Sequence, residues 1–150
     1  MKHITIICLL LLTTALSAAT KETEVPYWVM AGILAQETKS RYEVVNGVEH
    51  IVYVDQTVGA AGELSAFQIT WKAWKQVHAL EPDRRFRDLA TDQIYAERVA
   101  MRYLLWLYNN SAKQSWPHAV QFYNRGPGKL SYSYYANVVA KARKAGYPEN

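Results

Sequence analysis

The stretch TDQIYAERVAMRYLLWLY, residues 91–108, has the strongest helical pattern in the chain. Its apolar side chains recur at helical spacing and cover one wide face; they are Ile94, Tyr95, Val99, Tyr103, Leu104, Trp106 and Leu107. A helix with so wide an apolar face is stable in water only when other elements cover it. We therefore expect residues 91–108 to form the central buried helix of the fold.

Shorter helices are expected on both sides of this one, at residues 26–36, 71–78, 115–123 and 131–145. Pro26 suits a first helical turn, where its missing N–H removes no hydrogen bond. Thr70 is a favourable N-cap for the second of these helices. Gly126 and Pro127 stop the third. In the last helix, three side chains are expected to face inward: Tyr135, Val138 and Val139.

One segment departs from the helical spacing. Residues 42–54 contain two β-branched runs separated by Asn46-Gly47, a strong signal for a tight hairpin turn. Residues 56–63 are rich in Gly and Ala and are expected to form a loop, and residues 81–88 a polar connection. The sequence therefore predicts one mainly α domain with a small β-hairpin inserted after the first helix.

The N-terminus has the composition of a secretory signal peptide. Basic residues at positions 2 and 3 precede an apolar run at residues 4–12 and small residues at 15–19, where Ser17 or Ala19 suits a signal peptidase. The apolar run is too short for a comfortable membrane span. We expect residues 1–19 to be the signal and residues 20–150 the domain of a secreted or periplasmic protein; an uncleaved anchor is the alternative. Cys8, the one cysteine, lies inside the signal, so the mature chain has no disulfide.

The charge balance bears on possible partners. The formal net charge is +4, and the chain has no Lys or Arg run long enough to suggest a nucleic-acid partner. A mild positive charge suits an anionic polymer outside the cytoplasm, such as a cell wall, and is equally consistent with ordinary solubility. His50, His78 and His118 have no metal-ligand spacing, so no metal and no cofactor are expected.

Glu37 is the first candidate for chemistry. The first helix has an apolar stripe made of Tyr27, Met30, Ile33 and Leu34. Glu37 follows Ile33 by four residues and Leu34 by three, so it extends this stripe. A carboxylate in the last turn also meets the unfavourable end of the helix dipole. Both effects favour the protonated form, which a general acid needs. The alternative is a structural salt bridge with Arg41.

Three motifs follow one another along the chain: Ala35-Gln36-Glu37-Thr38, then Gly62-Glu63-Leu64-Ser65-Ala66-Phe67-Gln68-Ile69, then Tyr123-Asn124-Arg125-Gly126-Pro127-Gly128. In this order they resemble the lysozyme-like superfamily of lytic transglycosylases and goose-type lysozymes, including the catalytic domain of soluble lytic transglycosylases. The corresponding family motifs are Glu-Ser, Gly-Leu-Met-Gln-Ile or Gly-Pro-Phe-Gln-Ile, and Tyr-Asn-Ala-Gly. The resemblance spans residues 27–140 and implies an α+β lysozyme-like fold.

The chain departs from the family pattern at three positions. Thr38 stands where the family usually has Ser, Ser65 where it usually has Gly, and Arg125 where Ala is common. The catalytic glutamate is retained, and the departures concern the contacts with the sugar.

The resemblance implies a role for each matching residue. Glu37 corresponds to the general acid that protonates the glycosidic oxygen between N-acetylmuramic acid and N-acetylglucosamine. Gln68 corresponds to a residue that bonds a sugar or lines the cleft, and Tyr123 and Asn124 to residues that brace the pocket, with a Tyr hydroxyl able to orient Glu37. The expected substrate-binding set is Glu63, Ser65, Phe67, Gln68, Tyr123 and Asn124. Phe67 is alternatively a core residue.

The resemblance leaves the mechanism open. In a lytic transglycosylase the sugar's own 6-hydroxyl attacks and no second carboxylate is needed, whereas a lysozyme-type hydrolase would need Glu63 or Asp55 as well. Side chains suited to the cleft rim are Tyr132, Tyr134 and Tyr135. We expect a monomeric enzyme that acts on peptidoglycan glycan strands without stable membrane insertion after signal cleavage. The alternatives are a non-catalytic glycan-binding or secretion-assembly module, and an enzyme that cleaves chitin or chitosan.

Overall fold

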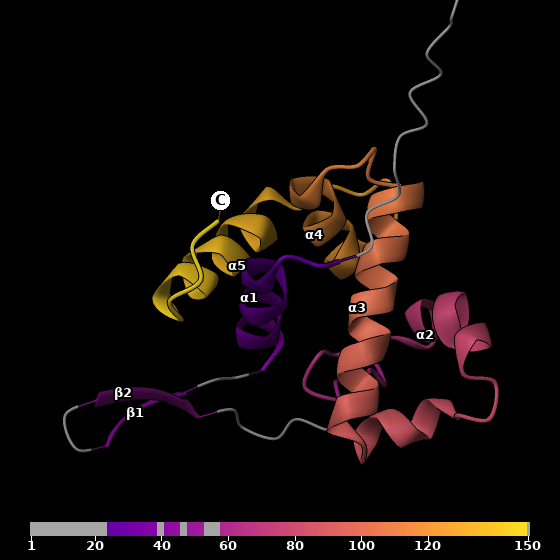
Figure 1. Ribbon diagram of the computed structural model, residues 1–150, viewed down its shortest axis with the longest axis horizontal. Coiled ribbons are helices and arrows are strands. Elements are labelled where there is room, and N and C mark those ends of the chain that lie inside the picture. Colours follow the sequence, from indigo (N-terminus) through magenta and orange to yellow (C-terminus); the bar gives the residue numbers. More distant parts are fainter. Residues whose placement is uncertain (1–23, 39–40, 46–47, 53–57, 150) are drawn as a thin grey trace, which may run out of the picture.

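The computed structural model describes residues 24–38, 41–45, 48–52 and 58–149, and in these residues the chain is mainly helical (Figure 1). The α-helices are α1 (Tyr27–Glu37), α2 (Trp71–Val77), α3 (Gln93–Asn110), α4 (Trp116–Arg125) and α5 (Tyr132–Lys144). Two short 3-10 helices, η1 (His78–Leu80) and η2 (Phe86–Ala90), lie between α2 and α3. None of the helices in this part of the chain is long and apolar enough to cross a membrane.

Helix α3 is the central element, with α2, α4 and η2 packed against it. The Asp92 side chain caps its first turn by accepting a hydrogen bond of 2.9 Å from the Tyr95 backbone N–H. Five of the seven apolar residues predicted for its buried face are buried: Tyr95, Val99, Tyr103, Leu104 and Leu107. The prediction is wrong for Ile94, which is 67% exposed, because it lies about 100° around the helix from Tyr95. Trp106 is partly buried.

Helix α1 packs against α5, and the close approach of the two helices depends on Gly32. A Cβ at this position would lie 2.5 Å from the Val138 carbonyl oxygen and 2.7 Å from Val138 Cγ1. The buried apolar residues of α1 are Trp28, Val29, Ile33 and Ala35. The buried face of α1 is therefore rotated about the helix axis relative to the predicted apolar stripe. Ile33 is buried, and Met30 and Leu34 are partly buried. Tyr27 is 82% exposed, because the face of α1 that packs against α5 is the one that contains Gly32.

Helix α5 turns Tyr134 and Val138 toward the core. Both are buried, whereas Tyr135 and Val139, which were expected to face inward, are partly buried and pack at the edge of the core. The prediction is therefore confirmed for Val138, whereas Tyr134 takes the inner position that was predicted for Tyr135. This one-residue shift decides which tyrosine reaches Glu37.

Strands β1 (Arg41–Val45) and β2 (Val48–Val52) form a two-stranded antiparallel sheet after α1, with Arg41 opposite Val52 and Val45 opposite Val48. The sheet lies to one side of the helices, at the lower left of Figure 1. The strands flank Asn46-Gly47, where a turn is predicted; these two residues and the signal segment lie outside the described residues.

The N-cap predicted for α2 is confirmed, and α4 is capped by a side chain in the same way. The Thr70 hydroxyl accepts a hydrogen bond of 3.1 Å from the Ala73 backbone N–H and caps α2. Ser115 caps α4 by accepting from the His118 N–H at 3.4 Å. Helix α4 runs to Arg125, two residues further than predicted, and ends at Gly126 with a φ of 86°, which favours glycine.

Candidate active site

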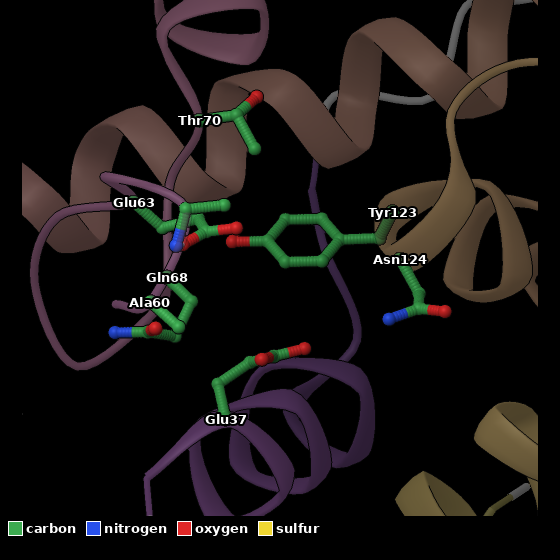
Figure 2. Close-up of a pocket in the computed structure, with 8 residues that line it drawn as sticks. Glu37, Ala60, Glu63, Gln68, Thr70, Tyr123 and Asn124 are labelled. Atoms are coloured by element: carbon green, nitrogen blue, oxygen red, sulfur yellow. The ribbon is translucent and has the colours of Figure 1, made fainter.

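A cavity of about 300 Å³ lies where the C-terminal ends of α1 and α4 meet the loop before α2 (Figure 2). It is lined by Glu37, Ala60, Ala61, Glu63, Gln68, Thr70, Tyr123 and Asn124. Glu37 points into it from α1, and the Tyr123 ring reaches from α4 toward the loop that carries Glu63. Segments far apart in the sequence thus bring five predicted site residues together: Glu37, Glu63, Gln68, Tyr123 and Asn124.

Glu37 is the last residue of α1 and accepts a hydrogen bond of 2.5 Å from the Tyr134 hydroxyl to its Oε1 atom. Burial raises the pKa of Glu37 above its usual 4.5, and the negative charge of Glu63 raises it further. The hydrogen bond from Tyr134 and the positive charge of Lys141 act in the opposite direction and lower this pKa. The net direction is upward, as the sequence predicts.

The loop that faces Glu37 contains a backbone bridge and a tight turn within it. Leu64 and Ile69 exchange backbone hydrogen bonds of 3.0 and 2.8 Å, and the Gln68 N–H donates to the Ser65 carbonyl at 3.0 Å. Ser65 and Gln68 have φ angles of 69° and 50°, in the left-handed region. This conformation costs about 1–2 kcal/mol at each non-glycine residue. Glycine adopts these φ angles without strain, so a glycine would remove this cost at either position.

Ser65 and Phe67 do not lie on the cavity wall, although both are in the predicted substrate-binding set. Their side chains are buried, with exposed fractions of 3% and 2%. The Ser65 hydroxyl accepts a hydrogen bond of 3.2 Å from the Phe67 backbone N–H, and Phe67 packs in the core. Ser65 and Phe67 therefore shape the loop, and of these three motif residues Gln68 is the one that lines the cavity.

Tyr134, not Tyr123, supplies the hydroxyl that orients Glu37. The Tyr123 hydroxyl donates instead to the Phe67 carbonyl at 2.9 Å, which ties the end of α4 to the loop. Burial raises the pKa of Tyr123 and of Tyr134 well above 10, so both remain neutral hydrogen-bond donors. The sequence suggests only a place at the cleft rim for Tyr134. It is buried beneath Glu37, whereas Tyr132 is exposed.

Glu63 faces Glu37 across the cavity and is held by the backbone of its own loop. The Ala61 N–H donates to Glu63 Oε2 at 3.0 Å, and the Gly59 N–H donates to the Glu63 carbonyl at 2.7 Å. A Cβ at Gly59 would lie 2.2 Å from Gln68 Oε1 and 2.4 Å from Glu63 Oε2. Gly59 therefore leaves the space that these two side chains fill.

Four residues at the site are not predicted from the sequence. Ala60, Ala61 and Thr70 line the cavity, and Gly59 lies against two of its side chains. A Gly-Ala-rich loop beside a candidate acid is the signal that could have drawn attention to them. Asp55 and the Arg41 side chain, each invoked in an alternative reading, lie outside the described residues.

In the part of the chain that the structure describes, no group of three His, Cys, Asp or Glu side chains could hold a metal ion. The groups that face the cavity include one carboxyl group with a raised pKa, a second carboxyl group opposite it, and the amides of Gln68 and Asn124. Comparisons of the chain with protein-family models, curated proteins and solved structures each find no match.

Proposed function

We propose that this protein is a peptidoglycan lytic transglycosylase with a lysozyme-like fold, secreted or periplasmic, in which Glu37 is the general acid and base. The observation that carries the proposal is the position of Glu37: a partly buried carboxyl group with a raised pKa that faces an open cavity. A structural glutamate at a helix end would instead be solvated or paired with a cation. The order of the three motifs supports the same assignment.

The proposed reaction begins with proton transfer from Glu37 to the glycosidic oxygen as the bond from that oxygen to C1 breaks. Tyr134 holds Glu37 Oε1, which leaves Oε2 to carry the transferable proton. The 6-hydroxyl of N-acetylmuramic acid then attacks C1, returns its proton to the Glu37 carboxylate and closes a 1,6-anhydro ring. Gln68 and Asn124 supply amide groups on the cavity wall that suit hydroxyl and N-acetyl groups of a sugar.

A lysozyme-type hydrolase is the second candidate, and one observation favours it. Glu63 lines the same cavity as Glu37 and is close enough for its charge to raise the pKa of Glu37. Hydrolysis needs a second carboxylate to act as a base or nucleophile across the scissile bond, and Glu63 would take that role. The two mechanisms give different products, because hydrolysis leaves a reducing end and transglycosylation leaves an anhydro sugar.

The test is release of soluble fragments from purified peptidoglycan by the parent protein, Glu37→Gln and Glu97→Gln. Glu97 is an exposed glutamate on α3 and serves as the matched control. We expect Glu37→Gln to lose activity by at least about 100-fold while remaining folded, since general acid catalysis contributes on the order of 10²–10⁴-fold. Glu97→Gln should retain activity. Full activity in Glu37→Gln would refute the assignment.

Mass spectrometry of the released fragments separates the remaining alternatives. Anhydro-muropeptides support the transglycosylase, and reducing ends support hydrolysis with Glu63. Binding to peptidoglycan without any product would favour a non-catalytic glycan-binding or secretion-assembly module. Cleavage of chitin oligomers but not of peptidoglycan would move the substrate to another β-1,4-linked polymer.

A further inference from the structure

Lys141 joins the end of α1 to α5 close to the candidate acid. Its Nζ atom donates a hydrogen bond of 2.8 Å to the carbonyl oxygen of Ala35. Ala35 is fully buried and lies two residues before Glu37, in the last turn of α1. Lys141 is partly buried, so this contact between the two helices is sheltered from full hydration.

Lys141 and Tyr134 reach α1 from the same side of α5. They are seven residues apart, which is two helical turns, and Val138 lies between them on the same face. Gly32 allows this face to come close, because its missing side chain leaves room for the Val138 backbone. Helix α5 therefore makes two polar contacts with the end of α1. Tyr134 donates a hydrogen bond to the Glu37 carboxyl group, and Lys141 donates one to the backbone carbonyl of Ala35.

The groups around Glu37 come from every element packed at this point. Glu63 faces it from the loop, Tyr123 from α4, and Tyr134 and Lys141 from α5. Among these described groups Lys141 carries the positive charge. Lys141 and Glu37 do not form a direct ion pair, and the ammonium group acts on Glu37 through its field and through the backbone of α1.

We propose that Lys141 is a positioning residue for Glu37, which fixes the last turn of α1 against α5 and sets the electrostatic field in which Glu37 exchanges its proton. This inference rests on the proposed function for its catalytic consequences. Its electrostatic consequence can be measured without any catalysis. Lysine suits the role because a cation near the C-terminal end of a helix is stabilised by the carbonyl groups there.

The test uses Lys141→Met, which removes both the donor and the charge, and Lys141→Arg, which keeps both. Lys72→Met, at an exposed lysine on α2, is the control for loss of one positive charge. Lys141→Gln removes the charge but keeps a polar side chain, and provides a second neutral variant if Lys141→Met does not fold. Each protein is assayed for peptidoglycan cleavage across pH and for titration of the Glu37 carboxyl carbon by NMR.

We expect the Glu37 titration and the alkaline limb of the activity profile to move to higher pH in Lys141→Met and Lys141→Gln. Removing the positive charge favours the protonated form of Glu37, so its pKa rises. We also expect kcat in Lys141→Met to fall by about tenfold with little change in KM, because the hydrogen bond that holds the last turn of α1 is lost. Lys141→Arg should restore both properties, and Lys72→Met should match the parent.

The possible failures are distinguishable. If the parent shows no glycan cleavage, the proposed function fails, while an upward shift of the Glu37 titration in the neutral Lys141 variants still supports the role of Lys141. If the parent is active but neither neutral variant moves the Glu37 titration, the inference about Lys141 is overturned and the proposed function stands. An equal shift in Lys72→Met would also overturn it, because the effect would then be one of net charge.

Discussion

Substitution of Gly59 by alanine should impair the site while leaving the fold almost unchanged. The new Cβ would lie 2.2 Å from Gln68 Oε1 and 2.4 Å from Glu63 Oε2. To reach an ordinary contact of 3.4 Å, Gln68 Oε1 must retreat by about 1.2 Å and Glu63 Oε2 by about 1.0 Å. These atoms end flexible side chains and can move at little cost to stability. A misplacement of about 1 Å at a catalytic site costs on the order of 100-fold in rate.

Gly62 provides the matched control within the same loop. A Cβ at Gly62 would meet nothing within 4 Å, but its φ of 84° is in the region that favours glycine. Gly62→Ala should therefore cost about 1–2 kcal/mol of stability through backbone strain and crowd no site residue. Thermal unfolding and peptidoglycan cleavage would be measured for both variants. Gly59→Ala with full activity, or with a larger loss of stability than Gly62→Ala, would refute this reasoning.

Three further outcomes follow from the packing and charges. Glu63→Gln should move the alkaline limb of the activity profile to lower pH, because loss of the negative charge lowers the pKa of Glu37; a pH-rate profile with an unmoved limb would contradict this. Gly32→Ala should lower the free energy of unfolding by about 1–3 kcal/mol in denaturant titrations. The new Cβ would lie 2.5 Å from the Val138 carbonyl oxygen, which cannot move away unless α5 moves. An unchanged unfolding midpoint would refute the close approach of the two helices. Glu81→Gln should reduce the melting temperature at neutral pH, with the difference vanishing in acid; a pH-independent difference would count against the ion pairs.

The acid dependence expected for Glu81 follows from its two ion pairs with α3. Its carboxylate lies 3.1 Å from Arg98 Nε and 3.0 Å from Arg102 Nη1. Desolvation raises the pKa of Glu81, but the hydrogen bonds and charges of the two arginines outweigh it and lower the pKa below 4.5. A lowered pKa means that the stabilisation is present above the unfolded value and is lost as the pH falls through the folded value.

The sequence predicts best those features that depend on a single helix or motif. The apolar spacing of residues 91–108 predicts one long helix, and α3 forms there from Gln93 to Asn110; Glu37 is placed by its position at the end of α1. The ordered motifs also brought together Glu63, Gln68, Tyr123 and Asn124, which lie in one cavity with Glu37. The order of the motifs therefore predicts five of the eight residues that line the cavity.

The sequence could not decide features that depend on how two elements approach each other. Whether Tyr134 or Tyr135 meets Glu37 depends on the rotation of α5 about its axis, and the close contact at Gly32 fixes that rotation. The same contact leaves Tyr27 exposed, although its spacing matches the apolar stripe. Helical periodicity defines a face, but the neighbouring helix determines which part of that face is covered.

The loop residues were misjudged for a different reason. Ser65 and Phe67 share a motif with Gln68, and the motif suggests a common role for all three. The turn between Leu64 and Ile69 reverses the chain within four residues and sends their side chains in different directions. Ser65 and Phe67 are consequently buried while Gln68 faces the cavity. The φ angles that produce this arrangement cannot be read from residue types at these positions.

The most direct measurement of the central claim is the titration of the Glu37 carboxyl group in the unaltered protein, followed by NMR at its carboxyl carbon. We expect a midpoint above 4.5, since burial and the charge of Glu63 outweigh the hydrogen bond from Tyr134 and the charge of Lys141. Glu37 would then retain its proton at pH values where an ordinary glutamate has lost it. A midpoint at or below 4.5 would contradict the role of Glu37 as general acid, because Glu37 would then be an ordinary carboxylate with no proton to donate.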